Sequence, residues 1–301
     1  MIGLDWGTSS LRAWRFAPDG QVMARRETAQ GITSLPEGGF PAAFAAATGD
    51  WVADGESQAL LCGMIGSRQG WLEAPYLACP AGPAEIAAAA VPLPIPGGPR
   101  AMLIPGLTCR DADGVPEVMR GEETKLVALL ARVGTREATL CSPGTHAKWA
   151  RVAGGCIQGF TTQMTGEVFA ALSRHTILRH SLDEAPPGEG IPPGFAAGIA
   201  QAKRPGGLLH QIFGLRTRSL MGEIERRDGA GFLSGLLIGR EVASVLEAGV
   251  APPIVIAGAD HLARLYAAAL DAWEIPNQSA GADLAAEGLV AIGRALGMLR
   301  A

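Results

Sequence analysis

Ile2-Gly-Leu-Asp-Trp-Gly-Thr-Ser-Ser-Leu-Arg-Ala-Trp-Arg-Phe16 opens the chain with two short apolar runs separated by a glycine turn, and a polar break follows at residues 18–20. Short apolar runs between turn residues favour strands over helices. The stretch therefore predicts a strand, a tight turn, a second strand, a hairpin loop and a third strand. A glycine-punctuated hairpin of this kind suggests a nucleotide-binding α/β protein.

The first turn combines a carboxylate with groups suited to a phosphate. Asp5 stands at the end of the first predicted strand. Gly7 lacks a Cβ that would keep a phosphate from the backbone, while Thr8 and Ser9 offer hydroxyls. Asp5 is a candidate Mg²⁺ ligand, mostly through water, because this ion prefers oxygen ligands and releases its waters reluctantly. An ordinary hairpin with a turn aspartate is the alternative.

A second glycine turn follows a predicted strand at residues 138–142. It begins a turn, strand and hairpin pattern like the one at residue 5, which weakly indicates an internal repeat. This turn offers four candidate phosphate-binding residues: Gly144, Thr145, His146 and Lys148. The alternatives are a structural turn with a surface lysine and a satisfied, partly buried imidazole.

A third glycine turn, Ile256-Ala-Gly-Ala-Asp260, follows a late predicted strand, although helix capping by Asp260 would also explain it. Three such turns in this order resemble the actin/hexokinase-like kinases. The chain has no G-x-x-x-x-G-K-[ST] motif, and no G-x-G-x-x-G opens a helix after the first strand. A P-loop kinase and a Rossmann dinucleotide enzyme are therefore excluded.

The composition restricts the class of protein and its partners. Of the 301 residues 48% are apolar, which excludes a disordered chain, and this length commonly forms two domains. The net charge is −4 without a basic stripe, so we expect no nucleic acid partner. The five cysteines never form C-x-x-C, which predicts free thiols. Without a signal peptide or the roughly 18 apolar residues of a membrane span, we expect a cytoplasmic protein that binds no membrane.

Other patterns complete the outline. Buried strands are predicted at residues 59–63 and 100–104, and a Pro- and Gly-rich exposed loop at 185–194. Apolar spacing predicts helices at residues 39–54, 122–131, 168–178, 229–248, 261–272 and 284–299. The helix at 229–248 is predicted to lie in the core.

Ten motifs spread from end to end identify the chain as similar to the 2-dehydro-3-deoxygalactonokinase family. They are Asp5-Trp-Gly, Leu11-Arg-Ala-Trp, Gly63-Met-Ile-Gly-Ser, Ala74-Pro-Tyr-Leu, Ile104-Pro-Gly-Leu, Val118-Met-Arg-Gly-Glu-Glu-Thr, Pro143-Gly-Thr-His, Lys148-Trp, Met164-Thr-Gly-Glu and Phe232-Leu-Ser-Gly-Leu-Leu-Ile-Gly. The resemblance implies phosphorylation of the 6-hydroxyl of 2-dehydro-3-deoxy-D-galactonate by ATP and Mg²⁺ in D-galactonate catabolism. It also implies an α/β fold of two ribonuclease-H-like domains with an interdomain cleft.

The resemblance suggests where a catalytic base would stand. Similar sugar kinases carry an Asp at the start of a helix, where this chain has Glu122 and Glu123, so either glutamate is a candidate base. Both could instead cap the helix that begins there. Arg120 could clamp the carboxylate or 2-keto oxygen of the substrate, or form a buried ion pair with Glu122 or Glu167.

The remaining site residues are assigned by analogy with the same class. Candidate sugar-acid ligands, with tight packing turns as the alternative, are Gly63, Met64, Gly66, Ser67, Arg120, Thr165 and Glu167. Candidate ATP ligands are Gly7, Thr8, Ser9, Arg12, Gly144, Thr145, His146, Lys148, Gly258 and Ala259, the last two beside the adenine.

The expected domains are a sugar-binding domain at residues 1–125, a nucleotide-binding domain at 126–280 and a terminal helix at 281–301 that packs on the first. A kinase for another small sugar acid and a non-catalytic ATP- or sugar-binding regulator remain alternatives. A homodimer is one assembly state that the sequence leaves open.

Overall fold

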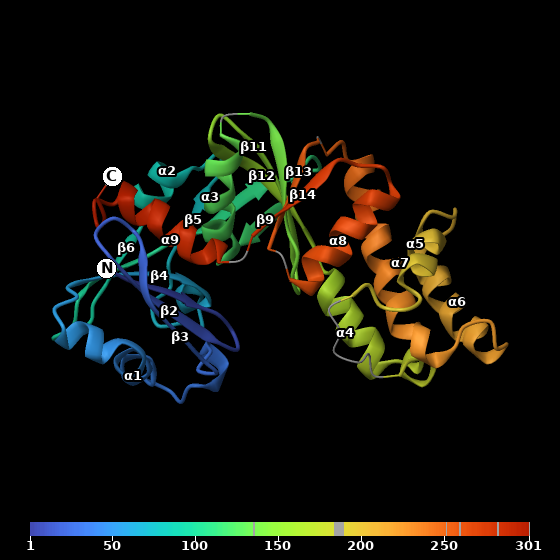
Figure 1. Cartoon of the computed structure of the whole chain (residues 1–301), viewed down its shortest axis with the longest axis horizontal. Helices are drawn as coiled ribbons and strands as arrows, with labels where there is room; N and C mark the ends of the chain where they lie inside the picture. Colours follow the sequence, from blue (N-terminus) through green and yellow to red (C-terminus); the bar gives the residue numbers. More distant parts are fainter. Residues whose placement is uncertain (135, 184–189, 251, 259, 282, 301) are drawn as a thin grey trace. The chain divides into compact units, whose positions relative to one another are not determined.

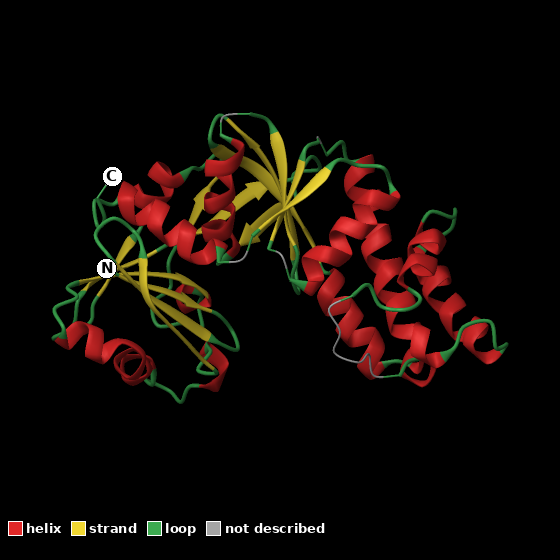
Figure 2. Ribbon diagram, in the orientation of Figure 1, coloured by secondary structure: helices red, strands yellow, loops and turns green. Residues whose placement is uncertain are grey.

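The computed structural model describes residues 1–134, 136–183, 190–250, 252–258, 260–281 and 283–300 (Figure 1). Strands and helices are mixed throughout, as expected for the α/β class (Figure 2). The chain divides into two compact units. The first comprises Met1–Arg136, Val152–Phe160 and Asp283–Ala301, and the second comprises Glu137–Arg151 and Thr161–Ala282.

The first unit is built on a six-stranded mixed sheet with the order β3-β2-β1-β4-β7-β6 and a three-stranded sheet with the order β5-β8-β9. Its elements are β1 (Ile2–Trp6), β2 (Leu11–Phe16), β3 (Val22–Thr28), η1 (Ile32–Ser34), α1 (Phe40–Ala53), β4 (Gln58–Gly63), η2 (Met64–Gly66), β5 (Tyr76–Ala78), α2 (Pro83–Ala88), β6 (Val91–Leu93), β7 (Arg100–Leu103), β8 (Gly106–Arg110), β9 (Pro116–Met119), α3 (Glu122–Val133) and α9 (Leu284–Ala295). The three strands predicted at the start of the chain are confirmed. The sequence prediction placed a domain boundary after residue 125, which lies inside α3.

The two faces of strand β1 pack against different parts of the first unit. The residues that join the core with α1 are Ile2, Leu4 and Trp6. Successive residues of a strand point to opposite faces, so Gly3 and Asp5 share the other face. A Cβ on Gly3 would lie 3.1 Å from a methyl group of Leu289 in α9. The alternation therefore directs the Asp5 carboxylate away from the core beneath α1.

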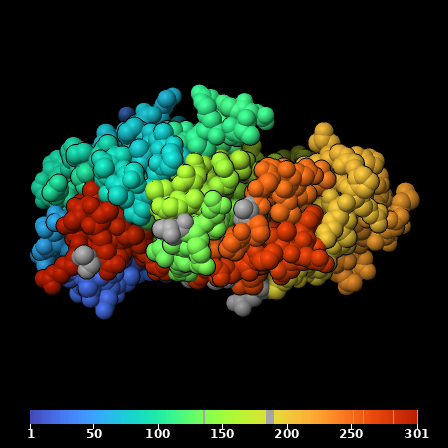
Figure 3. All heavy atoms as spheres, turned by 90° about the horizontal axis from the view of Figure 1, so that it is seen from above, coloured from blue at the N-terminus to red at the C-terminus, as the bar shows by residue number. Residues whose placement is uncertain are grey.

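Helix α9 returns the end of the chain to the first unit. Arg132 of α3 forms an ion pair with Glu287 of α9 at 2.8 Å. A Cβ on Gly288 would lie 1.8 Å from the carbonyl oxygen of Thr124, so only glycine permits this helix contact. Figure 3 shows the C-terminal residues, in red, beside the N-terminal residues, in blue.

The second unit is built on a five-stranded sheet with the order β12-β11-β10-β13-β14. Its elements are β10 (Ala138–Ser142), β11 (Ala147–Ala153), β12 (Cys156–Gln163), α4 (Thr165–His175), η3 (Ile177–Ser181), α5 (Phe195–Ala202), α6 (Leu208–Leu220), α7 (Arg226–Glu247), β13 (Ile254–Ala257), α8 (His261–Ala272) and β14 (Asn277–Ala280). The end of β11 and most of β12, at residues 152–160, are grouped with the first unit. The next two strands in sequence flank β10 on one side and the two later strands lie on the other. Strand β1 is flanked in the same way, in agreement with the predicted internal repeat.

Helix α7 is the core helix that the apolar spacing predicts. Phe232, Leu236 and Val242 are among its buried residues. By length and composition α7 could cross a membrane, but 72% of its most apolar window is buried inside the protein. Burial to this extent is typical of a core helix.

The structure also contains elements that the sequence did not predict. Strands β5, β6 and β8 lie between residues 76 and 110 of the first unit, and α5 and α6 lie between residues 195 and 220 of the second. Residues 184–189 of the predicted exposed loop lie outside the described residues. All five cysteines are free thiols, as predicted.

Candidate active site

Asp5 is held by an arginine from the neighbouring strand. In the antiparallel register of β1 and β2 it lies opposite Arg12, whose guanidinium forms an ion pair with Oδ2 of Asp5. The Asp5 side chain is largely buried, while Arg12 is more accessible. A backbone hydrogen bond from Gly7 to Ser10 closes the turn at 2.9 Å. An aspartate that only stabilised the turn would accept hydrogen bonds from the backbone N–H groups of that turn. The ion pair with Arg12 therefore favours a role for Asp5 beyond shaping the turn.

Two glycines bring the ends of β1 and β4 and the start of α3 together. Gly63 has a φ of +94°, and a Cβ there would lie 2.7 Å from the carbonyl oxygen of Trp6 and 3.1 Å from Oδ1 of Asp5. Gly121 has a φ of +104°, and its Cβ would lie 3.3 Å from the Cα of Gly63. Both positions require glycine because side chains disfavour this backbone conformation and the space is filled. Motifs predicted separately around Asp5, Gly63 and Gly121 thus form one cluster.

Glu123 lies inside this cluster and is fully buried. Its Oε2 accepts a hydrogen bond from the Gly121 N–H at 2.6 Å, and Oε1 accepts one from the Thr124 hydroxyl at 3.1 Å. Burial, followed by the nearby charge of Glu122, raises the pKa of Glu123 to about 8. The Glu123 carboxyl is therefore mainly protonated at neutral pH.

Glu122 is the more accessible of the two candidate bases. Its side chain is half-buried, and its Oε2 accepts a hydrogen bond from the backbone N–H of Arg120 at 3.1 Å. Both glutamates thus bond to N–H groups just ahead of α3, as the capping alternative predicts. A general base must reach the proton that it removes, and on this criterion the geometry favours Glu122 over Glu123.

Arg120 lies between a glycine turn and an aromatic ring. Its Nη2 donates to the carbonyl oxygen of Ala74 at 2.8 Å, and the guanidinium lies 4.4 Å from the centre of the Tyr76 ring. On the other side, a Cβ on Gly66 would lie 2.9 Å from Nη1. The buried ion pair with Glu122 is not formed, because Glu122 bonds to the backbone of Arg120 instead. Ser67, next to Gly66, is also buried.

In the second unit the turn at residues 143–148 packs on the start of α4. A Cβ on Gly166 would lie 2.6 Å from the carbonyl oxygen of Gly144, and the Glu167 N–H donates to Thr145 at 3.1 Å. The side chains of His146 and Glu167 pair at 2.5 Å, and each is about half-exposed. The predicted residues Thr145, His146 and Glu167 thus lie together.

Lys148 is not a surface lysine. It is buried, and its Nζ donates to the hydroxyl of Thr162 on β12 at 2.8 Å. The alternative interpretation with an exposed lysine is wrong because β11 turns this side chain into the protein.

The sequence did not reveal a buried polar network around Glu241 of α7. Its carboxylate accepts hydrogen bonds from the Trp149 indole at 2.6 Å and from the Tyr266 hydroxyl at 2.8 Å. The side chain of Thr165 also bonds to it, and burial raises the pKa of Glu241. Glu241 lies four residues after the apolar Leu237, on the buried side of α7, and that spacing is the signal that could have revealed it.

A cavity of about 640 Å³ opens beside this network, between α4, α7 and α8. Gly144, Thr165 and Tyr266 are among its lining residues, together with apolar side chains of all three helices. Volumes of this order accommodate small organic ligands.

The third glycine turn connects β13 to α8. Gly258 has a φ of +105°, and its N–H donates to Ala280 at 3.0 Å. Ala259, predicted beside the adenine, lies outside the described residues. Asp260 caps α8 by accepting from the Ala263 N–H at 2.9 Å, which confirms the capping interpretation.

In the part of the chain that the structure describes, no group of three or more His, Cys, Asp or Glu side chains could hold a metal ion. A metal at Asp5 would therefore take most of its ligands from water or from a phosphate-bearing substrate.

Comparisons with known proteins agree over nearly the whole chain. Residues 5–292 match a family described as 2-keto-3-deoxy-galactonokinase. A probable 2-dehydro-3-deoxygalactonokinase from Rhizobium meliloti is 37% identical over 97% of this chain and 96% of that protein. The 2-dehydro-3-deoxygalactonokinase of Escherichia coli is 38% identical over 81% of this chain and 80% of that protein.

Solved structures give the same picture for the fold. A protein from Sinorhizobium meliloti assigned as a 2-dehydro-3-deoxygalactonokinase has a TM-score of 0.90 and 37% identity, and the match covers 98% of both chains. Component A of the (R)-2-hydroxyglutaryl-CoA dehydratase of Acidaminococcus fermentans has a TM-score of 0.54 at 11% identity over 99% of this chain and 98% of that one. The second likeness concerns the fold alone.

Proposed function

The chain belongs to the 2-keto-3-deoxy-galactonokinase family, and from this premise we propose how its residues carry out the reaction. It is a sugar-acid kinase that phosphorylates 2-dehydro-3-deoxygalactonate with ATP. The phosphoryl group goes to the 6-hydroxyl, which gives 2-dehydro-3-deoxy-6-phosphogalactonate and ADP. The observation that carries the assignment of residues is the cluster of Asp5, Gly63, Gly121 and Glu122 in the first unit.

Glu122 is the proposed base. Phosphoryl transfer needs in-line positioning, neutralisation of charge and a group that accepts the proton of the attacking hydroxyl. Glu122 stands half-buried at the start of α3, whereas Glu123 is enclosed and mainly protonated at neutral pH. Glu123 in this proposal holds the backbone turn at Gly121 through its hydrogen bond.

Asp5 suits a Mg²⁺ ion that keeps most of its water. Arg12 occupies Oδ2 of Asp5, while Oδ1 lies beside Gly63, where no side chain intervenes. One free carboxylate oxygen matches the way Mg²⁺ binds through one or two carboxylates, waters and substrate phosphates. When bound, the ion would neutralise charge on the transferred phosphoryl group. Arg12, held in place by Asp5, would add a second positive charge.

The second unit would bind the nucleotide. The N–H groups at the start of α4 and the turn at Gly144 and Thr145 are the proposed phosphate contacts, because a helix N-terminus favours negative charge. Gly144 and Thr165 also line the cavity of about 640 Å³, whose apolar walls suit a nucleoside. His146 pairs with Glu167 in the same turn and would donate to a phosphate when protonated.

The finer description of the fold belongs to this proposal. The shared strand order of the two large sheets supports two ribonuclease-H-like domains of the actin/hexokinase-like class, with substrates meeting in a cleft. The cytoplasm is the expected compartment, and the partners are small molecules.

A coupled ADP-release assay tests the function. The purified protein would be given ATP and Mg²⁺ with a panel of 2-dehydro-3-deoxy sugar acids and plain aldoses. We expect turnover with the galactonate-derived acid. Preference for another acid would change the substrate within the same chemistry. ATP binding without turnover of any acid would favour the non-catalytic regulator, which the kinase names of the relatives do not support.

A further inference from the structure

Arg120 is half-buried, and its guanidinium has no carboxylate partner among the described residues. Its Nη2 donates to the Ala74 carbonyl oxygen, but Nε and Nη1 are buried and make no hydrogen bond. The neighbouring carboxylate of Glu122 accepts from the Arg120 backbone instead. The hydroxyl of Ser67 is likewise buried without a partner.

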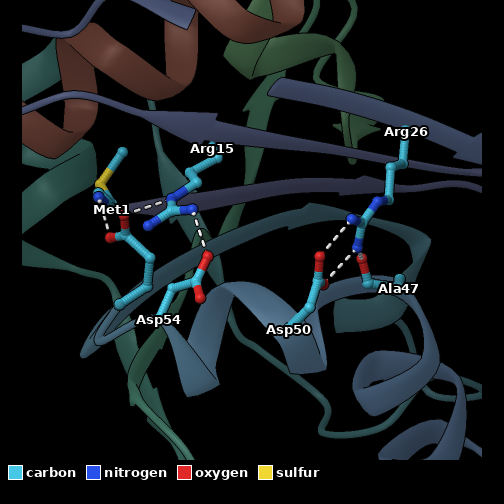
Figure 4. Close-up of polar contacts among 7 residues, drawn as sticks. Met1, Arg15, Arg26, Ala47, Asp50 and Asp54 are labelled. Atoms are coloured by element: carbon cyan, nitrogen blue, oxygen red, sulfur yellow. Dashed lines mark hydrogen bonds and ion pairs between the residues drawn. The ribbon is translucent and has the colours of Figure 1, made fainter. Parts of the chain in front are cut away.

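Two other arginines of the first unit, Arg15 and Arg26, have guanidinium groups that pair with carboxylates (Figure 4). Arg26 lies 4.4 Å from the Trp51 ring centre, the same distance as Arg120 from Tyr76. Arg26 nevertheless donates to both carboxylate oxygens of Asp50, at 2.6 and 2.5 Å. Arg15 bonds to Asp54 and Glu56 in the same way.

An unpaired buried charge is costly. A buried donor without an acceptor destabilises a protein, and an unpaired buried charge destabilises it more. Tyr76 covers one face of the Arg120 guanidinium, and the backbone of Gly66 approaches Nη1 closely. The guanidinium is thus held in place, while three of its N–H groups, one on Nε and two on Nη1, donate no hydrogen bond. Such an arrangement suits a ligand that brings its own oxygen acceptors.

Resting on the proposed function, we infer that Arg120 and Ser67 bind the carboxylate and adjacent 2-keto oxygen of the sugar acid. A 2-oxo acid presents three acceptor oxygens at one end, and these match the unused donors of Arg120 together with the Ser67 hydroxyl. A site built to hydrogen-bond a substrate group rejects analogues that lack it, because its buried donors then stay unpaired. Arg120 thereby selects sugar acids against aldoses.

The test compares two ligands and four variants. KM and kcat are measured by ADP release, and affinity without ATP by calorimetry, for 2-dehydro-3-deoxygalactonate and its C1 amide. The amide keeps the sugar but lacks the negative charge. The variants are Arg120→Met, Arg120→Lys, Ser67→Ala and the control Arg26→Met, each also followed by thermal unfolding.

The wild type should bind the acid about 10- to 100-fold more tightly than the amide, the range expected for a charge-assisted contact. Arg120→Met should raise KM for the acid by a similar factor and alter kcat less. It should weaken the amide less than the acid, because the amide keeps the 2-keto oxygen but lacks the charge. Arg120→Lys should recover part of the preference, and Ser67→Ala should weaken both ligands several-fold. The melting temperature of Arg120→Met should stay level or rise, because replacing an unpaired buried charge by an apolar chain relieves a cost. Arg26→Met should leave the acid-to-amide ratio unchanged.

An unchanged acid-to-amide ratio in Arg120→Met would overturn the inference. If the melting temperature of this variant also fell, the role of Arg120 would be structural. Failure of the proposed function has a different signature, namely no wild-type ADP release with any sugar acid. In that case calorimetry still tests the role of Arg120. Acid binding to the wild type that is lost in Arg120→Met would support the inference, and no acid binding to the wild type would overturn it.

Discussion

Replacing Glu123 by Gln should make the protein less sensitive to rising pH. The Glu123 carboxyl has an ordinary pKa of 4.5 that burial raises to about 8 in the folded state. Between these pH values the unfolded chain loses the proton while the folded protein keeps it. Because the unfolded state then binds fewer protons, the free energy of unfolding falls as pH rises. A tenfold change in proton affinity corresponds to about 1.4 kcal/mol, so the total loss is on the order of 5 kcal/mol.

Glutamine has the same shape and stays neutral, and its amide oxygen can accept from the Gly121 N–H as the carboxyl oxygen does. Unfolding by urea at pH 5 to 9 should therefore show Glu123→Gln gaining stability over the wild type up to about pH 8 and no further. The control Glu27→Gln removes an exposed partner of Arg25 and should change stability by less than about 1 kcal/mol at each pH. Parallel curves for the wild type and Glu123→Gln would refute the raised pKa.

Three further substitutions test the site. Glu122→Gln should lower kcat by about 10²–10⁴-fold, the usual contribution of a general base, whereas Glu123→Gln should lower it far less; equal small losses in ADP release would leave both residues as helix caps. Asp5→Asn should abolish turnover while calorimetry still detects sugar-acid binding, and wild-type rates would contradict the Mg²⁺ role. Gly63→Ala should cost roughly 1–3 kcal/mol in chemical unfolding, because its φ is +94° and the new Cβ would lie 2.7 Å from a carbonyl oxygen of β1; an unchanged midpoint would show that the turn relaxes freely.

The sequence predicted those parts of the site that depend on local geometry. Asp5 and Gly63 lie at the ends of buried strands and Gly144 follows one. Such strand ends are recognisable from apolar runs that stop at glycine. The long helices were equally clear, because α1 and α7 repeat apolar residues over several turns. Short elements were missed: β5 and β6 have three residues each, too few for a periodic pattern.

Side-chain partners could not be predicted, because they come from distant parts of the chain. Lys148 reads as an exposed turn residue until β12 supplies the Thr162 hydroxyl. Trp149 and Glu241 are far apart in sequence yet share a buried hydrogen bond. The unpaired state of Arg120 is equally invisible, because Glu122 is a plausible partner in sequence and bonds elsewhere in the fold.

The two units share a strand order but carry opposite chemistry in their first turns. In the first unit the turn carries Asp5, and Arg12 pairs with one of its two carboxylate oxygens. In the second unit the equivalent turn carries His146, which pairs with Glu167, and it packs on the start of α4. A carboxylate attracts a cation, whereas a helix N-terminus attracts an anion. In the proposed function, this contrast assigns the metal and the sugar acid to the first unit and the phosphates of the nucleotide to the second.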